Sequence, residues 1–73
     1  DEINVKKIPK FIGKTIKDTK IRDNYDLMIV CIIHNNNSTT INPKSDQIIE
    51  KNDTIMVIGD KDKLDLFASQ QTS

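Results

Sequence analysis

Residues 20–33, KIRDNYDLMIVCII, decide the fold, because they join a predicted helix to the most apolar segment of the chain. The β-branched run at 27–33 predicts a central strand that is buried on both faces. The residues before it, 14–25, predict one helix or two short helical turns with an imperfect apolar stripe. Asp26 is expected to end this helical segment, because Asp tolerates the left-handed backbone conformation better than most residues.

The remaining pattern predicts three more strands and a second helix. Residues 2–8 begin in strand-like alternation that Pro9 ends, and short β-prone segments follow at 39–41 and 54–58. Asp60 and Asp62 predict the start of a closing helix, because acidic side chains favour the positive end of the helix dipole. The order strand, helix, strand, strand, strand, helix indicates an α+β domain whose second and third strands form a hairpin.

A length of 73 residues predicts one domain over residues 1–73, with an ordered part at 3–68. A core of this size is thin, so dimerisation is a common way for such a domain to gain burial. The first residue is Asp, and we therefore expect the chain to be a fragment of a longer protein. No segment approaches the roughly 20 apolar residues of a membrane helix.

The formal charge is balanced, with eleven basic and eleven acidic side chains. This balance argues against a nucleic-acid-binding domain, which relies on an excess of basic residues. The two ends differ, because residues 1–22 carry seven bases against three acids and the remainder carries four bases against eight acids. The basic end either attracts an anionic ligand or is a solvated lysine face.

Signals for catalysis and metal binding are nearly absent. Cys31 is the single cysteine and lies in the apolar run, which predicts a buried thiol rather than a disulfide or a thiolate metal site. His34 is the single histidine and is expected to be an exposed residue at a hairpin end. Gly13 and Gly59 are the only glycines, so a glycine-rich phosphate loop is excluded. We expect no enzymatic activity, no metal and no required cofactor.

Arg22 is the only arginine in the chain. With Lys17 and Lys20 it would suit a phosphate, which arginine binds through two parallel hydrogen bonds. The alternative is an ion pair with Asp18 or Asp26, each four residues away along the helical segment. Spacing alone favours the ion pair.

Several short motifs occur in a characteristic order. They are a glycine, a helical isoleucine, an Ile-Arg pair, a tyrosine, an apolar strand, a proline, an aspartate, a strand ending in Val-Ile-Gly and a Leu-x-x-Phe helix: Gly13, Ile16, Ile21-Arg22, Tyr25, 27–33, Pro43, Asp53, Val57-Ile58-Gly59, Leu64 and Phe67. In this order they resemble the C-terminal subdomain of regulators of potassium conductance, the TrkA-C domain, over residues 3–68. The resemblance implies a βαβββα fold and a homodimer.

The resemblance also implies a function. The implied function is that of the ligand-sensing end of a bacterial cytoplasmic subunit, which regulates a potassium channel, a potassium transporter or a cation antiporter at the membrane. The implied ligand is the second messenger cyclic di-AMP, bound between two protomers, whereas other members bind calcium. Two alternatives stay open, namely a structural dimerisation module whose ligand binds elsewhere and a sensor domain fused to a transcriptional regulator. No nucleic acid is expected to bind the domain itself.

The same resemblance implies a ligand site. Arg22 falls on the phosphate-contacting position, and Ile16 and Ile29 fall on positions that pack against adenine. Pro43 lies near the loop that closes over the base. The implied ligand-binding residues are Ile16, Thr19, Lys20, Arg22, Leu27, Met28, Ile29 and Pro43.

Two features depart from the family pattern. Asp26 stands where a glycine usually follows the tyrosine. Leu27 and Met28 stand where nucleotide-binding members often carry a polar pair, so backbone groups are expected to replace the missing side-chain hydrogen bonds. Thr19 and Lys20 fall at polar positions that face the cleft.

Overall fold

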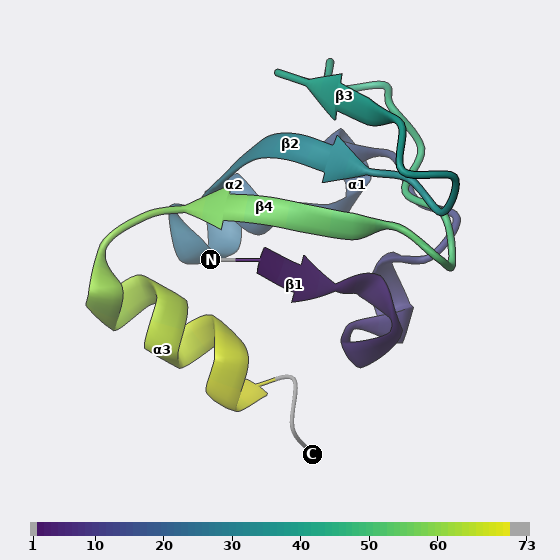
Figure 1. Cartoon of the computed structure of the whole chain (residues 1–73). Helices are drawn as coiled ribbons and strands as arrows, with labels where there is room; N and C mark the ends of the chain where they lie inside the picture. Colours follow the sequence, from purple (N-terminus) through teal and green to yellow (C-terminus); the bar gives the residue numbers. More distant parts are fainter. Residues whose placement is uncertain (1, 71–73) are drawn as a thin grey trace.

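The structure is a computed structural model that describes residues 2–70. A four-stranded antiparallel sheet packs with three α-helices and two 3₁₀ helices (Figure 1). In chain order the elements are β1 (Glu2–Asn4), η1 (Val5–Lys7), η2 (Pro9–Phe11), α1 (Ile16–Thr19), α2 (Ile21–Tyr25), β2 (Met28–Ile33), β3 (Thr39–Ile41), β4 (Thr54–Ile58) and α3 (Lys61–Gln70). This order confirms the predicted α+β fold of βαβββα type. Within residues 2–70, none of the helices has the length and apolar character needed to cross a membrane.

The sheet has the strand order β1-β4-β2-β3, so β2 and β4 are its central strands, and β2 and β3 form the predicted hairpin. A register shift between Ile29 and Cys31 marks a bulge in β2. In a regular strand Ile29 and Ile32 would point to opposite faces. Because the bulge adds one residue, both reach the buried face.

The helices cover one face of the sheet and close a single core. Phe67 of α3 lies at its centre, with its ring edge-on to Tyr25 of α2 at 4.9 Å and tilted against Phe11 at 5.9 Å between centroids. The Tyr25 hydroxyl donates a hydrogen bond of 2.5 Å to Oε1 of Gln70, which joins α2 to the last residue of α3. These contacts fix α2, which carries Arg22, against α3.

The other face of the sheet is uncovered and apolar. We call it the open sheet face. Cross-strand partners share a side of the sheet, and the apolar members of this face are Met28, Cys31, Ile33, Ile41, Met56 and Ile58. Met28 is 44% exposed, Ile58 53% and Ile41 79%. The prediction that 27–33 is buried on both faces is therefore wrong for a single chain, and Cys31 is only partly buried.

The first strand is shorter than predicted. β1 ends at Asn4, and Val5–Lys7 forms a 3₁₀ turn instead of continuing the strand. The Asn4 side chain causes this early end, because its Oδ1 accepts a hydrogen bond from the backbone N–H of Lys6 at 3.0 Å. α3 runs to Gln70, two residues beyond the expected ordered part, while residues 1 and 71–73 lie outside the described residues.

Gly59 follows β4 because no side chain fits there. Its φ lies outside the left-handed region, but an added Cβ would collide with Cδ2 of Leu27 and lie 3.5 Å from the carbonyl oxygen of Asp26. Leu27 is 1% exposed and cannot move into solvent. The family-like glycine is therefore a packing requirement.

Gly59→Ala is expected to lower the free energy of unfolding by about 1–3 kcal/mol, because the methyl group overpacks the core at Leu27. Urea denaturation followed by circular dichroism measures this loss. Combining Gly59→Ala with Leu27→Ala should be less destabilising than the sum of the two single changes, because Leu27→Ala removes the side chain with which the new methyl group collides. Strict additivity would contradict the steric explanation.

Candidate functional site

A groove lies between the short helices α1 and α2, the start of β2 and the loop after β3. Its volume is about 400 Å³. The loop is fixed against α1, because the backbone N–H groups of Ile16 and Lys17 donate to the carbonyl oxygens of Gln47 and Ser45 at 3.0 and 2.9 Å. The lining residues are Ile16, Lys17, Lys20, Ile21, Arg22, Asp23, Leu27, Met28, Ile29, Asn42, Pro43 and Ser45.

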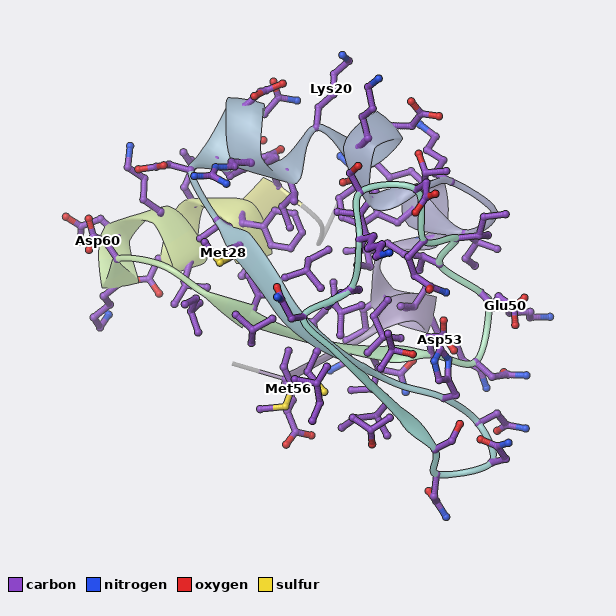
Figure 2. The ribbon with its side chains drawn as sticks, turned by 90° about the horizontal axis from the view of Figure 1, so that it is seen from above. Lys20, Met28, Glu50, Asp53, Met56 and Asp60 are labelled. Atoms are coloured by element: carbon purple, nitrogen blue, oxygen red, sulfur yellow. The ribbon has the colours of Figure 1, made fainter. Side chains whose placement is uncertain are left out.

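Lys20 separates the two short helices and lies on the groove. Its φ of 54° is left-handed, which ends α1 and begins α2. Figure 2 shows Lys20 at this junction with its side chain directed outward from the molecule. The buried Thr19 stabilises the junction, since its hydroxyl donates to the Ile16 carbonyl at 2.6 Å and accepts from the Ile21 N–H at 3.3 Å. The break brings Ile16, before it, and Arg22, after it, to the same groove.

Arg22 is exposed and lies where two hollows meet. Besides the groove it lines a smaller hollow of about 190 Å³, together with Asp26, Met28 and Ile58. Across residues 2–70 the salt bridges are His34–Asp53 and Lys61–Asp65, so neither of the ion pairs considered for Arg22 forms. The guanidinium group is therefore available to an anion, and apolar walls lie on both sides of it.

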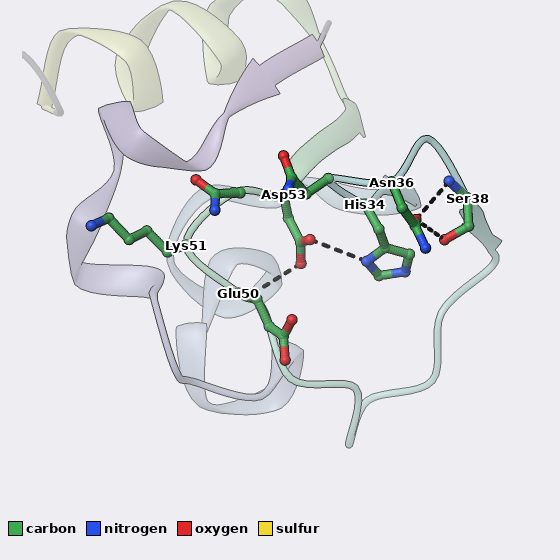
Figure 3. A pocket seen from close by; sticks show the side chains of 8 residues that line it. His34, Asn36, Ser38, Glu50, Lys51 and Asp53 are labelled. Atoms are coloured by element: carbon green, nitrogen blue, oxygen red, sulfur yellow. Dashed lines mark hydrogen bonds and ion pairs between the residues drawn. The ribbon is translucent and has the colours of Figure 1, made fainter.

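A second polar cluster lies at the far end of the sheet. Nδ1 of His34 lies 3.1 Å from Oδ1 of Asp53, and Nε2 lies 2.7 Å from the hydroxyl of Thr40. The other oxygen of Asp53 accepts from the Glu50 N–H at 2.9 Å (Figure 3). The expectation that His34 is an ordinary exposed residue is therefore wrong, because its side chain is only 24% exposed and is held by two partners.

The cluster borders a recess of about 620 Å³ between the β2–β3 turn and the turn that precedes β4. Each oxygen of Asp53 and each ring nitrogen of His34 already has a partner within the protein. Within the part of the chain that the structure describes, no group of three or more His, Cys, Asp or Glu side chains is placed to hold a metal ion. We therefore assign the cluster a structural role and take the groove at Arg22 as the candidate site.

Comparison with known proteins identifies the family of this chain. The family model of the TrkA-C domain matches residues 2–71. The chain belongs to the TrkA-C domain family. This TrkA-C domain is 40% identical over 60 residues to the K⁺/H⁺ antiporter subunit KhtT of Bacillus subtilis; the match covers 82% of this chain and 36% of that relative. The chain thus spans about a third of the length of KhtT.

Solved structures share the fold of this TrkA-C domain. The regulator of conductance of K⁺ (RCK) C domain of the potassium transport protein KtrA, in complex with cyclic di-AMP, is 26% identical, with a TM-score of 0.83 over 96% of this chain and 79% of that one. The RCK C domain dimer of BusR from S. agalactiae, in complex with cyclic di-AMP, is 25% identical, with a TM-score of 0.82 over 97% of this chain and 86% of that one. The RCK domain of GsuK is 24% identical, with a TM-score of 0.84 over 97% of this chain and 15% of that one. At this identity the similarity supports only a shared fold.

The groove brings together most of the residues that the resemblance implied. Those that line it are Ile16, Lys20, Arg22, Leu27, Met28, Ile29 and Pro43. Thr19 does not, because it is 7% exposed and both hydrogen bonds of its hydroxyl stay within the helix junction. Leu27 and Ile29 are almost fully buried and form the groove floor.

Sequence reasoning missed Asn42 as a lining residue of the groove in this TrkA-C domain. A signal was present, because asparagine tolerates the left-handed conformation better than other non-glycine residues. Asn42 adopts it, with a φ of 51°. Left-handed residues other than glycine are strained, and both Lys20 and Asn42 lie on the groove.

Proposed function

We propose that this TrkA-C domain is a regulatory, non-catalytic sensor that binds cyclic di-AMP at the groove and thereby controls a bacterial potassium or cation transport system. The observation that carries the proposal is the guanidinium of Arg22, which forms no salt bridge within residues 2–70 and lies on a groove lined by Ile16, Ile29 and Pro43. Such a site offers charge to a phosphate and apolar surface to a purine. Its similarity to the KtrA and BusR domains, both solved with cyclic di-AMP, supports the choice of ligand.

The ligand-binding unit of this proposal is a homodimer. The open sheet face carries several exposed apolar side chains, and a second copy of the chain would cover them. Figure 2 shows Met56, a member of this face, on the side of the sheet away from α1 and α2. Met28 and Ile58 belong both to this face and to the smaller hollow beside Arg22, so a covering copy would lie next to the guanidinium. Two symmetric arginines suit a ligand with two phosphates.

Regulation follows if the ligand prefers one dimer geometry. Cyclic di-AMP can shift the dimer only through a difference in affinity for its states. The partner in this proposal is a membrane transporter or antiporter reached through the full-length protein in the cytoplasm, as the similarity to KhtT suggests. The domain itself binds no nucleic acid, although fusion to a transcriptional regulator is the alternative suggested by BusR, which was also solved with its promoter DNA.

Isothermal titration calorimetry tests the proposal. Cyclic di-AMP added to the purified chain should bind with a stoichiometry of one ligand per two chains, and sedimentation should show a dimer. The ligand should also raise the melting temperature, because it binds only the folded state. A dimer that shows no binding heat at high micromolar ligand would favour the second candidate, a structural dimerisation module, which the open sheet face alone supports.

A further inference from the structure

Asn42 occupies a fixed place on the groove. It follows β3 directly and precedes Pro43, which lines the same groove. Its backbone N–H donates to the carbonyl oxygen of Val30 at 2.8 Å, at the bulge of β2. The left-handed φ of 51° therefore belongs to a residue that is tied to the sheet rather than to a free loop. The hydrogen bond to β2 thus holds the backbone of Asn42 at the edge of the groove.

The Asn42 carboxamide is free to bind a ligand. The side chain is exposed, and no hydrogen bond of the structure within residues 2–70 engages it. The other polar side chains on the groove are the cations of Lys17, Lys20 and Arg22, the Asp23 carboxylate and the Ser45 hydroxyl. Asn42 is thus the one lining residue whose side chain presents a fixed donor and a fixed acceptor side by side.

We propose that the Asn42 carboxamide reads the edge of the purine bound in the groove and sets a preference for adenine over guanine; this inference rests on the proposed function. Adenine presents an N6 donor beside an N7 acceptor, which a carboxamide matches with two hydrogen bonds. Guanine presents two acceptors, O6 and N7, on the same edge. Met28 has no such group, so the carboxamide replaces the polar side chain that the strand lacks.

The chain contains a matched pair of variants for the test. Asn42→Gly removes the carboxamide and keeps the backbone, because glycine adopts a positive φ freely. Asn37→Gly makes the same change at a φ of 68° in the β2–β3 turn, away from the groove. Both variants should unfold at similar denaturant concentrations. A difference between them in ligand binding therefore reports the groove and not the fold.

Calorimetric titrations with cyclic di-AMP and cyclic di-GMP give the decisive ratio of dissociation constants. The unmodified chain and Asn37→Gly should prefer cyclic di-AMP, and Asn42→Gly should reduce this preference by about tenfold or more, because a bidentate contact to a base discriminates by about that factor. Asn42→Asp, which keeps the size but has no donor for N7, should also weaken cyclic di-AMP binding.

The outcomes separate the two proposals. If the unmodified chain binds neither cyclic dinucleotide, the proposed function fails, and this inference fails with it. If the unmodified chain binds cyclic di-AMP and Asn42→Gly keeps the full preference, the proposed function stands and the role of Asn42 is overturned. Equal affinity of the unmodified chain for both ligands would overturn the role of Asn42 as well.

Discussion

Arg22→Ala is expected to weaken cyclic di-AMP binding by at least about 100-fold. A hydrogen bond to a charged group contributes about 1.5–3 kcal/mol. Because two copies of Arg22 would face the two phosphates of one ligand, the combined loss of binding free energy reaches at least about 3 kcal/mol. Stability should change by less than about 0.5 kcal/mol, because the side chain is exposed and forms no salt bridge within residues 2–70. Calorimetry and urea denaturation measure the two effects separately.

Two control variants sharpen this test. Arg22→Lys keeps the charge but not the two parallel hydrogen bonds, so binding should weaken by about tenfold, between the unmodified chain and Arg22→Ala. Lys14→Ala removes one positive charge from the same basic end of the chain, but Lys14 does not line the groove. Its affinity should therefore stay near that of the unmodified chain. Similar losses for Lys14→Ala and Arg22→Ala would show that net charge, not the site, governs binding.

The regular elements could be predicted because their signals are local. The apolar runs at 27–33 and 54–58 correspond to β2 and β4, and the segment that begins with Asp60 and Asp62 corresponds to α3. The helix break could not be placed, because lysine has no preference for the left-handed conformation that Lys20 adopts. Tertiary contacts impose it, in part through the buried hydroxyl of Thr19.

The site was predictable only in part. Arg22 became a site residue through the family resemblance, since its spacing to Asp18 and Asp26 favoured ion pairs that do not form. Thr19 was assigned to the ligand, although its hydroxyl serves the backbone of the helix junction. The burial of both Ile29 and Ile32 on one face of β2 depends on a bulge, which the alternation of apolar residues in the sequence does not predict. These features depend on contacts between distant residues, which sequence spacing does not encode.

Asp53→Ala should cause a large loss of stability in this domain. Asp53 is 2% exposed, and its carboxylate accepts hydrogen bonds from the Glu50 N–H and faces the His34 ring. Alanine would leave both of these groups without their acceptor. The expected loss is about 3 kcal/mol, the size found when one partner of a buried charged contact is removed. A chain of 73 residues has a total stability of only about 4–11 kcal/mol.

Two further variants, Asp53→Asn and His34→Ala, separate the contribution of the carboxylate hydrogen bonds from the contribution of side-chain size. Asp53→Asn keeps the shape and one acceptor oxygen, so it should cost about 1–2 kcal/mol. His34→Ala should cost about 1 kcal/mol, because the ring is 24% exposed and water can reach Asp53 once it is gone. Circular dichroism in urea is the suitable measurement, since the chain has no tryptophan. If the free energy of unfolding of Asp53→Ala stays within about 0.5 kcal/mol of that of the unmodified chain, the cluster does not stabilise the turn before β4. Asp53, which belongs to the family-like motif, would then have another role.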